Sequence, residues 1–243
     1  GDVRALNKLV RMIRAETMTL KYWSLKGNLR LIGYPDAAYQ NNSDKSSQRG
    51  QTIFLAEPRV KSGKEDSKGS LIDFESQKIK RAVLSTTVSE LYAFMKCFGT
   101  CQFLRGLWMD MSGQIADIHM RTDAKNLVTT ATTTHLPEQK ETIHMIQMLR
   151  TEACSGSIQD LAHVVSADCL ADCLTKSSAK ADALIKAVNT GVLPFVDKHP
   201  PFRELMKDKH KAYLLSAWIV SNIPAADQVC SFFGEPVQFK EIL

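Results

Sequence analysis

Four acidic residues lie at predicted strand ends or in predicted helices, where ligand-binding side chains are often found. Asp36 ends a predicted strand, Glu90 lies in the first turns of a predicted helix, and Asp123 ends a later strand. Asp172 lies in a predicted helix further along the chain. Strand ends beside a helix N-terminus converge in space, and converging carboxylates repel one another unless cations lie between them. The pattern therefore predicts a site for divalent metal.

Magnesium is the ion that best fits such a set of ligands. It takes oxygen ligands, keeps several waters and shares the rest of its coordination shell with substrate phosphate. Two such ions about 4 Å apart would activate a water and stabilise the leaving oxygen of a cleaved phosphodiester. Manganese accepts similar ligands and is an alternative. Asp168 competes with Asp172 as the fourth acid, but its position just before a helix favours a capping role, so Asp172 is preferred.

The stretch from Leu84 to Met95 organises the elements around these acids. It predicts the end of a strand, a Ser/Thr turn and the start of the helix that carries Glu90. The Ser and Thr side chains can cap the free amide groups at the helix start. Leu91, Met95 and Phe98 recur at helical spacing, which places Glu90 beside a buried stripe with its carboxylate against the sheet.

The other elements follow from alternation, periodicity and turn residues. Strands are predicted at 29–34, 51–55, 70–76 with 82–84, 115–121 and 160–165. Helices are predicted in 1–25, from the Ser/Thr turn to Gly113, in 124–134, at 137–153, after a cap at Ser166 and Asp168, and over much of the chain beyond Ser177. Three strands followed by alternating helices and strands predict an α/β fold, with a mixed sheet and helices on its faces.

Length and composition are those of an ordinary globular protein. The 243 residues can bury one main core with additions at either end, and 44% hydrophobic and 23% charged residues fit that class. A net charge of +5 permits a polyanionic partner without requiring one. No apolar run reaches the length of a membrane span, so no membrane is expected as a partner.

The six cysteines show no disulfide framework of the secreted type. Cys97 and Cys101, like Cys169 and Cys173, are spaced i,i+4 in helix-like segments, which suits small buried side chains better than zinc ligands. Reduced core cysteines imply an intracellular protein of the cytoplasm or nucleus. If a targeting peptide was removed before Gly1, an organelle matrix is the expected location.

Several motifs, in order, resemble the ribonuclease H domain of the Pol polyproteins of copia-type LTR retrotransposons. The resemblance covers roughly residues 1–180. Its most specific part is Leu170-Ala171-Asp172-Cys173-Leu174-Thr175-Lys176, which is similar to the family's Leu-Ala-Asp-x-x-Thr-Lys. The other matching stretches are Leu20-Lys21-Tyr22, Gly33-Tyr34-Pro35-Asp36-Ala37, Asp44-Lys45-Ser46-Ser47-Gln48-Arg49-Gly50, Ser76-Gln77-Lys78, Ala82-Val83-Leu84-Ser85-Thr86, Glu90-Leu91-Tyr92-Ala93 and Thr122-Asp123-Ala124.

This resemblance implies a ribonuclease H-like mixed five-stranded sheet flanked by helices. Residues 1–27 would be a connection-like helical segment, 28–178 the ribonuclease H-like domain, and 179–243 a mostly helical C-terminal extension. The family cuts the RNA strand of RNA–DNA hybrids with two magnesium ions. Carried over by position, its catalytic and metal-binding acids are Asp36, Glu90, Asp123 and Asp172.

The chain also departs from the family at several positions. Ala38, Val88 and Ala124 replace residues that are often acidic or amide-bearing there, and Glu141 stands where the late helix of the family has His. His163 lies inside a predicted strand and is interpreted as a structural histidine. These departures predict a lower rate of catalysis than in the family, but they leave the four proposed metal ligands in place.

Two functions are compatible with this pattern. The first is a retroelement-derived nuclease acting on RNA–DNA hybrids. The second is a domesticated fold, catalytically weak or inactive, that binds structured RNA or protein in a ribonucleoprotein assembly such as a ribosome. The apolar segments Tyr213–Ile223 and Val229–Leu243 in the C-terminal extension are expected either to contact a protein partner or to cover one face of the sheet.

Overall fold

The computed structural model describes residues 19–57, 67–132, 142–176, 178–194 and 196. It also describes residues 3, 4, 6, 7, 10 and 11, which have helical backbone. The first part of the helix predicted at 137–153 and the apolar segments Tyr213–Ile223 and Val229–Leu243 lie outside these residues. Within the described ranges, no helix is both long and apolar enough to cross a membrane.

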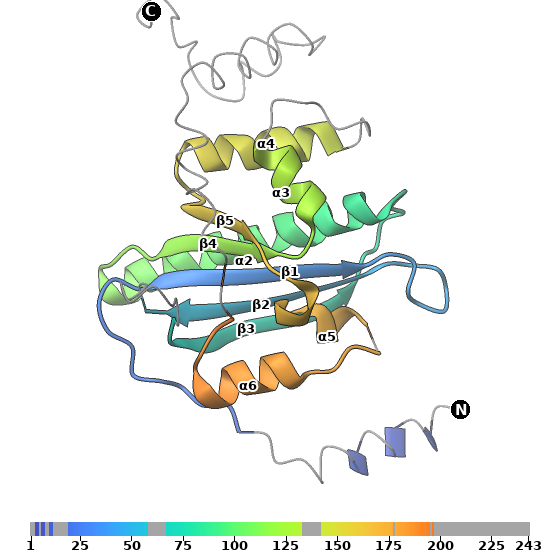
Figure 1. The fold of residues 1–243 in the computed structure, drawn as a ribbon, viewed down its shortest axis with the longest axis horizontal. Helices are drawn as coiled ribbons and strands as arrows, with labels where there is room; N and C mark the ends of the chain where they lie inside the picture. The colour runs from blue at the N-terminus through green and yellow to red at the C-terminus, as the bar shows by residue number, and fades with distance from the viewer. Residues whose placement is uncertain are drawn as a thin grey trace, which may run out of the picture.

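A five-stranded mixed sheet forms the centre of the molecule (Figure 1). Its strands lie in the order β3-β2-β1-β4-β5. The first three strands of the chain pair antiparallel, whereas β4 and β5 run parallel to β1. This topology confirms the predicted mixed five-stranded sheet. The strands are β1 (Arg30–Ala38), β2 (Gln48–Ala56), β3 (Gly69–Lys78), β4 (Asp117–Thr122) and β5 (Asp160–His163).

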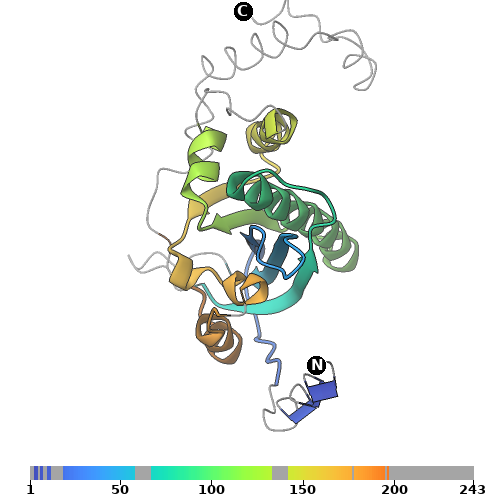
Figure 2. The ribbon, with the colours of Figure 1, turned by 90° about the vertical axis from the view of Figure 1, so that its right-hand side faces the viewer.

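Different helices cover the two faces of the sheet (Figures 1 and 2). The long helix α2 lies on one face together with α3 and α4, and the short α5 and α6 lie on the other. Each face has its own buried apolar cluster, so both sides of β1 are covered. The helices are α2 (Thr86–Ser112), α3 (Lys125–Thr132), α4 (Ile143–Cys154), α5 (Asp172–Thr175) and α6 (Asp182–Thr190).

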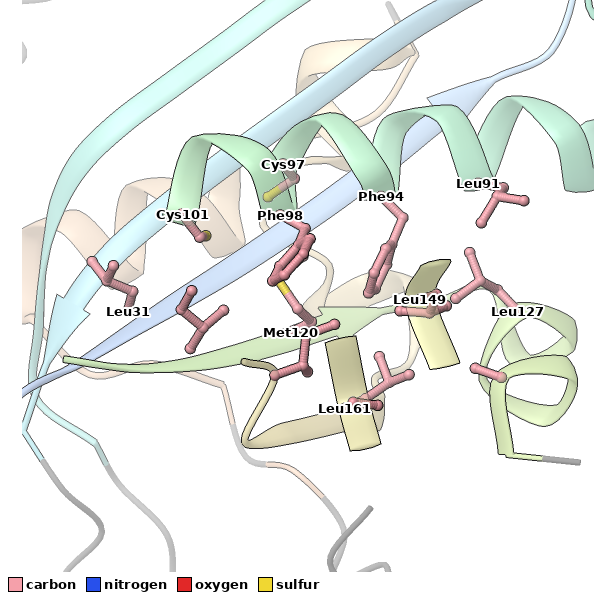
Figure 3. Close-up of a cluster of buried hydrophobic side chains, with 14 of the residues drawn as sticks. Leu31, Leu91, Phe94, Cys97, Phe98, Cys101, Met120, Leu127, Leu149 and Leu161 are labelled. Atoms are coloured by element: carbon pink, nitrogen blue, oxygen red, sulfur yellow. The ribbon is translucent and has the colours of Figure 1, made fainter. Parts of the chain in front are cut away.

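The larger core lies between α2 and the strands β1, β4 and β5 (Figure 3). Phe94 and Phe98 of α2 pack there against Met120 of β4, all nearly or fully buried. The backbone of β1 approaches α2 closely at Gly33, where an added Cβ would lie 2.9 Å from the Cys97 sulfur. Cys97 is buried with a free thiol, as the sequence predicts for a core cysteine.

The start of α2 follows the expected capping chemistry. Ser85 is the N-cap residue, and its hydroxyl accepts a hydrogen bond from the Val88 backbone N–H at 3.2 Å. The helix ends where expected, with Gly113 in the left-handed region at φ 68°. Glu90, the fifth residue of α2, therefore lies in a helix whose start is fixed by the Ser85 cap.

The separation of β1 from β4 creates the space for a site. β1 pairs with β4 only from Arg30 to Gly33, although β1 continues to Ala38. β4 meanwhile stays paired with β5 as far as Thr122. The last part of β1 has no strand beside it on the β4 side within the described chain. Side chains from that part of β1 and from the end of β4 can therefore meet between them.

Several local predictions are wrong in detail. Residues 82–84 form no strand; they belong to an irregular connection whose Ile79 and Val83 are buried against Val88. The single helix predicted after Ser166 is instead a 3₁₀ turn, Ser166–Asp168, followed by the separate α5. Asp168 does not cap α5, because the intervening turn places Ala171 at that position without a side-chain cap.

Residues 19–27 contact the start of β3 and the residue after β2. The Trp23 backbone N–H donates to Ser70 Oγ at 2.8 Å, and the Lys68 ammonium lies 5.3 Å from the centroid of the Trp23 ring. These contacts anchor the chain just before β1. The division into a connection-like segment at 1–27, a domain at 28–178 and an extension at 179–243 stays a prediction.

Candidate functional site

Asp36 is the centre of the candidate site. It lies in the part of β1 that pairs with β2 but extends beyond the pairing with β4, and its side chain is fully buried. Its Oδ2 atom accepts a hydrogen bond from the Thr175 hydroxyl, while Oδ1 has no hydrogen-bond partner among the described residues. Burial raises the pKa of Asp36, against the opposing effects of the Thr175 hydrogen bond and the Lys176 charge.

Glu90 of α2 and Asp123, the residue after β4, are the neighbouring acids of Asp36. Burial raises the pKa of Glu90 to about 9, and the charges of Asp36 and Asp123 add to the effect. The Ala37 backbone N–H donates to the Glu90 carboxylate, whereas Glu90 Oε2 is buried without a partner among the described groups. Two carboxyl groups thus retain unpartnered buried oxygens at the same place.

One group of side chains lies close enough to hold a metal ion. Single ligand atoms of Asp36, Asp123 and Cys169 all lie within 4.8 Å of one another. The Cys169 thiol donates to the Pro35 carbonyl at 3.8 Å. Burial and then the charge of Asp123 raise the pKa of this thiol well above its ordinary value, so Cys169 is a neutral thiol here. A neutral thiol is a poor ligand for a hard cation, which leaves the carboxylate oxygens as ligands.

Asp172 belongs to α5, which lies on the face of the sheet opposite α2. Its Oδ1 forms an ion pair with Lys176 Nζ, four residues later, and that ammonium lies 3.7 Å from Asp36 Oδ2. The two carboxylates therefore share one lysine. Together these two ion pairs raise the pKa of Lys176 even though burial acts to lower it.

The segment after Asp172 is tied to the hairpin of β1 and β2. The Asn41 side-chain amide donates to the Thr175 carbonyl at 3.1 Å. Gly50, which pairs with Asp36 across the sheet, lies so close that an added Cβ would be 2.8 Å from Thr175 Cγ2. This close approach lets the Thr175 hydroxyl reach Asp36.

Of the four acids selected from the sequence, Asp36 and Asp123 have carboxylate oxygens within 4.8 Å of each other, and Glu90 and Asp172 are near enough for their charges to interact with this pair. Asp36 is affected by the charges of both Asp123 and Asp172, and Glu90 by those of Asp36 and Asp123. Their roles as catalytic residues and metal ligands stay predictions.

Three residues that contact these acids have no role predicted from the sequence. Cys169 was identified only as a core cysteine, which its burial confirms. Thr175 and Lys176 belong to the most specific motif, which by itself predicts no function for them. The i,i+4 spacing of Asp172 and Lys176 was the available signal for their ion pair.

Comparisons with known proteins give likenesses of fold alone. No protein-family description and no curated protein matches the chain. The structure is similar to RNase H1 of the archaeon Halobacterium salinarum, with TM-score 0.40, 17% identity, and 64% of this chain and 97% of that chain covered. It is similar to LC11-RNase H1, solved with an RNA/DNA hybrid, with TM-score 0.43, 14% identity, and 64% and 99% covered. An N-terminal RNase H domain from Mycobacterium tuberculosis gives TM-score 0.41, 12% identity, and 67% and 99% covered.

The sheet itself defines the class of protein. Its strand order and directions are those of a ribonuclease H-like α/β fold, as the sequence predicts. The origin in copia-type elements stays a prediction.

Proposed function

We propose that this protein is a metal-dependent endonuclease that cleaves the RNA strand of RNA–DNA hybrids, and that it derives from a retroelement. The observation that carries the proposal is the unpartnered Oδ1 of the fully buried Asp36, which lies beside Asp123. A buried carboxylate is costly unless it is paired or coordinates a cation. Repulsion within such a cluster is relieved when a divalent ion binds.

The carboxylates fit magnesium, with manganese as a substitute. Asp36, Asp123 and Glu90 offer hard oxygen ligands of the kind these ions prefer. A bound divalent ion supplies Lewis acidity toward a phosphodiester and lowers the pKa of a water molecule. In this proposal Asp36 and Asp123 would hold the cation. Glu90, protonated near neutral pH in the metal-free protein, would release its proton to become a further ligand.

Exposed basic residues at the same end of the sheet support a nucleic-acid substrate. Lys78, whose ammonium forms an ion pair with Asp44, lies opposite Gln48 of β2, which in turn lies opposite Ala38, two residues beyond Asp36. Lys80 and Arg81 follow in the connection that leads into α2, and both are exposed. Such side chains suit phosphate backbones, while the 2′-hydroxyls of a hybrid would mark its RNA strand.

The test is cleavage of an end-labelled RNA strand annealed to DNA, in magnesium. We expect wild-type protein to cut the RNA and Asp123→Asn to lose at least about 100-fold in rate, because a neutral amide holds a cation poorly. Asp117→Asn is the matched control, since Asp117 is exposed at the start of β4, the strand that ends just before Asp123. Equal cleavage by both variants, or none by the wild type at any magnesium concentration, would refute the proposal.

One observation favours the second function, a structural subunit of a ribonucleoprotein. Lys176 already supplies a positive charge to Asp36 and Asp172, so part of the cluster is neutralised without metal. Under this alternative the protein binds structured RNA or a protein partner, the latter through residues 179–243. Undiminished binding of structured RNA in EDTA, with hybrids left intact in magnesium, would select it.

A further inference from the structure

We propose that the Lys176 ammonium takes one of two adjacent cation positions in this acidic site, so that the protein binds a single divalent ion there. The proposal rests on the proposed function only in assuming that the site binds metal. It replaces the pair of ions expected from the sequence with one ion and one lysine.

The first support is the position of the ammonium. Lys176 Nζ forms an ion pair with Asp172 Oδ1 and lies 3.7 Å from Asp36 Oδ2. It therefore bridges two carboxylates from different elements, as a metal ion between them would. The Asp36 side chain is only 1% exposed, so this bridge reaches into the interior rather than across the surface.

The second support is that the chain around Lys176 is held in place. Thr175, the residue before it, donates its hydroxyl to Asp36 and accepts a hydrogen bond at its carbonyl from Asn41. The Leu174 carbonyl accepts a further hydrogen bond from the Ser76 hydroxyl of β3. Contacts from β1, β3 and the β1–β2 loop thus fix the backbone next to Lys176. Its ammonium, at the end of a half-buried side chain, is further held by its contacts with Asp172 and Asp36.

The third support is that the two carboxylate oxygens of Asp36 have different neighbours. Oδ2 already interacts with the Thr175 hydroxyl and the Lys176 ammonium. Oδ1 is buried without a partner among the described residues. Asp36 and Asp123 belong to the group whose ligand atoms lie within 4.8 Å of one another. The second position, beside Asp123, is therefore the one left for a divalent ion.

Charge balance points the same way. The ammonium and one divalent ion together neutralise most of the formal charge of Asp36, Glu90, Asp123 and Asp172. A second divalent ion would leave the cluster with net positive charge and would lie against the Lys176 ammonium. Repulsion between like charges at such short range is strong wherever water is excluded. Removing the lysine side chain should therefore open the second position.

The experiment is calorimetric titration of metal-free protein with MnCl₂, with electron paramagnetic resonance to detect coupling between neighbouring Mn²⁺ ions. We expect one ion per chain and an uncoupled spectrum for wild type and for Lys176→Arg. We expect two ions and a coupled spectrum for Lys176→Met. Lys176→Gln repeats the test should the Met variant fail to fold. Lys186→Met, at an exposed lysine on α6, is the matched control and should bind one ion.

Each alternative result overturns the inference. Two ions in the wild type would show that the ammonium leaves its position, and no ion would show that the position beside Asp123 does not bind metal. One ion in the folded Met and Gln variants would show that Lys176 does not exclude a second. These counts do not depend on cleavage. A protein with the expected counts that leaves hybrids intact would refute the proposed nuclease alone.

Discussion

The raised pKa of Glu90 leads to a measurable dependence of stability on pH. Burial, together with the charges of Asp36 and Asp123, raises the pKa of Glu90 from 4.5 to about 9. Between these values the folded protein holds a proton that the unfolded chain has released. The stabilisation is therefore fully present below the unfolded pKa and is lost as pH rises toward 9. We expect the metal-free protein to become less stable from pH 5 to pH 8.

The size of the effect follows from linkage. A carboxyl group with these two pKa values contributes roughly 4 kcal/mol less stability at pH 8 than at pH 5. Glu90 is half-buried, and water that relaxes around its charge reduces the difference to about 2 kcal/mol. Glu90→Gln is the corresponding perturbation, because its amide stays neutral at every pH, as the protonated acid is.

The assay is urea unfolding in EDTA at several pH values, for wild type and Glu90→Gln. The variant should exceed the wild type by about 2 kcal/mol at pH 8 and match it near pH 5. The difference between the two proteins cancels the other titrating groups. His119 is one of these: burial lowers its pKa, so it adds stability as pH rises and would otherwise mask part of the loss.

Two results would refute this reasoning. The first is a constant difference in the free energy of unfolding between the two proteins from pH 5 to pH 8. The second is a wild type that gains on the variant as pH rises in EDTA. A saturating divalent ion serves as the internal check, since it should reverse the order at pH 8 by binding the ionised Glu90.

Two further predictions concern the groups that position the site. Gly50→Ala should lower the free energy of unfolding by about 1–3 kcal/mol and weaken Mn²⁺ binding, because the new Cβ displaces Thr175 from Asp36. Gly99→Ala is the control, since the space around Gly99 is open, and it should have neither effect. Urea unfolding measures the stability of each variant, and calorimetry measures its Mn²⁺ binding. Asp160→Asn should cost about 3 kcal/mol in urea unfolding, because it removes the charge that accepts the 2.6 Å hydrogen bond from the buried Arg121; a loss under 0.5 kcal/mol would contradict this.

Much of the fold could be predicted because its causes are local. The alternation and β-rich composition of the strands, and the Ser85 cap before the long stripe of α2, act over a few residues of chain. The prediction of secondary structure was less accurate where local sequence rules are compatible with either one continuous helix or a turn between two helices. Residues 166–176 have helical spacing throughout, but Leu170 and Ala171 are buried in the second core, and a turn there divides the segment.

The candidate site was predictable in composition and only partly in geometry. Four acids at strand ends and helix starts could be selected from their positions, since the topology of a mixed sheet brings such ends together. Asp168 was assigned a cap it does not form, because capping depends on where the helix actually begins. The proximity of Cys169 to Asp36 and Asp123 had no signal in the sequence.

The sequence by itself thus determined the kinds of elements, their order and the identity of the acids. Only the tertiary structure decided that the two oxygens of Asp36 have different surroundings, one beside Thr175 and Lys176 and the other unpartnered. Asp36 and Thr175 are 139 residues apart, and they meet because the strand around Gly50 leaves room for α5 to dock. Local patterns act within a few residues of the chain, whereas docking depends on the packing of whole elements and places its contacts without regard to sequence distance.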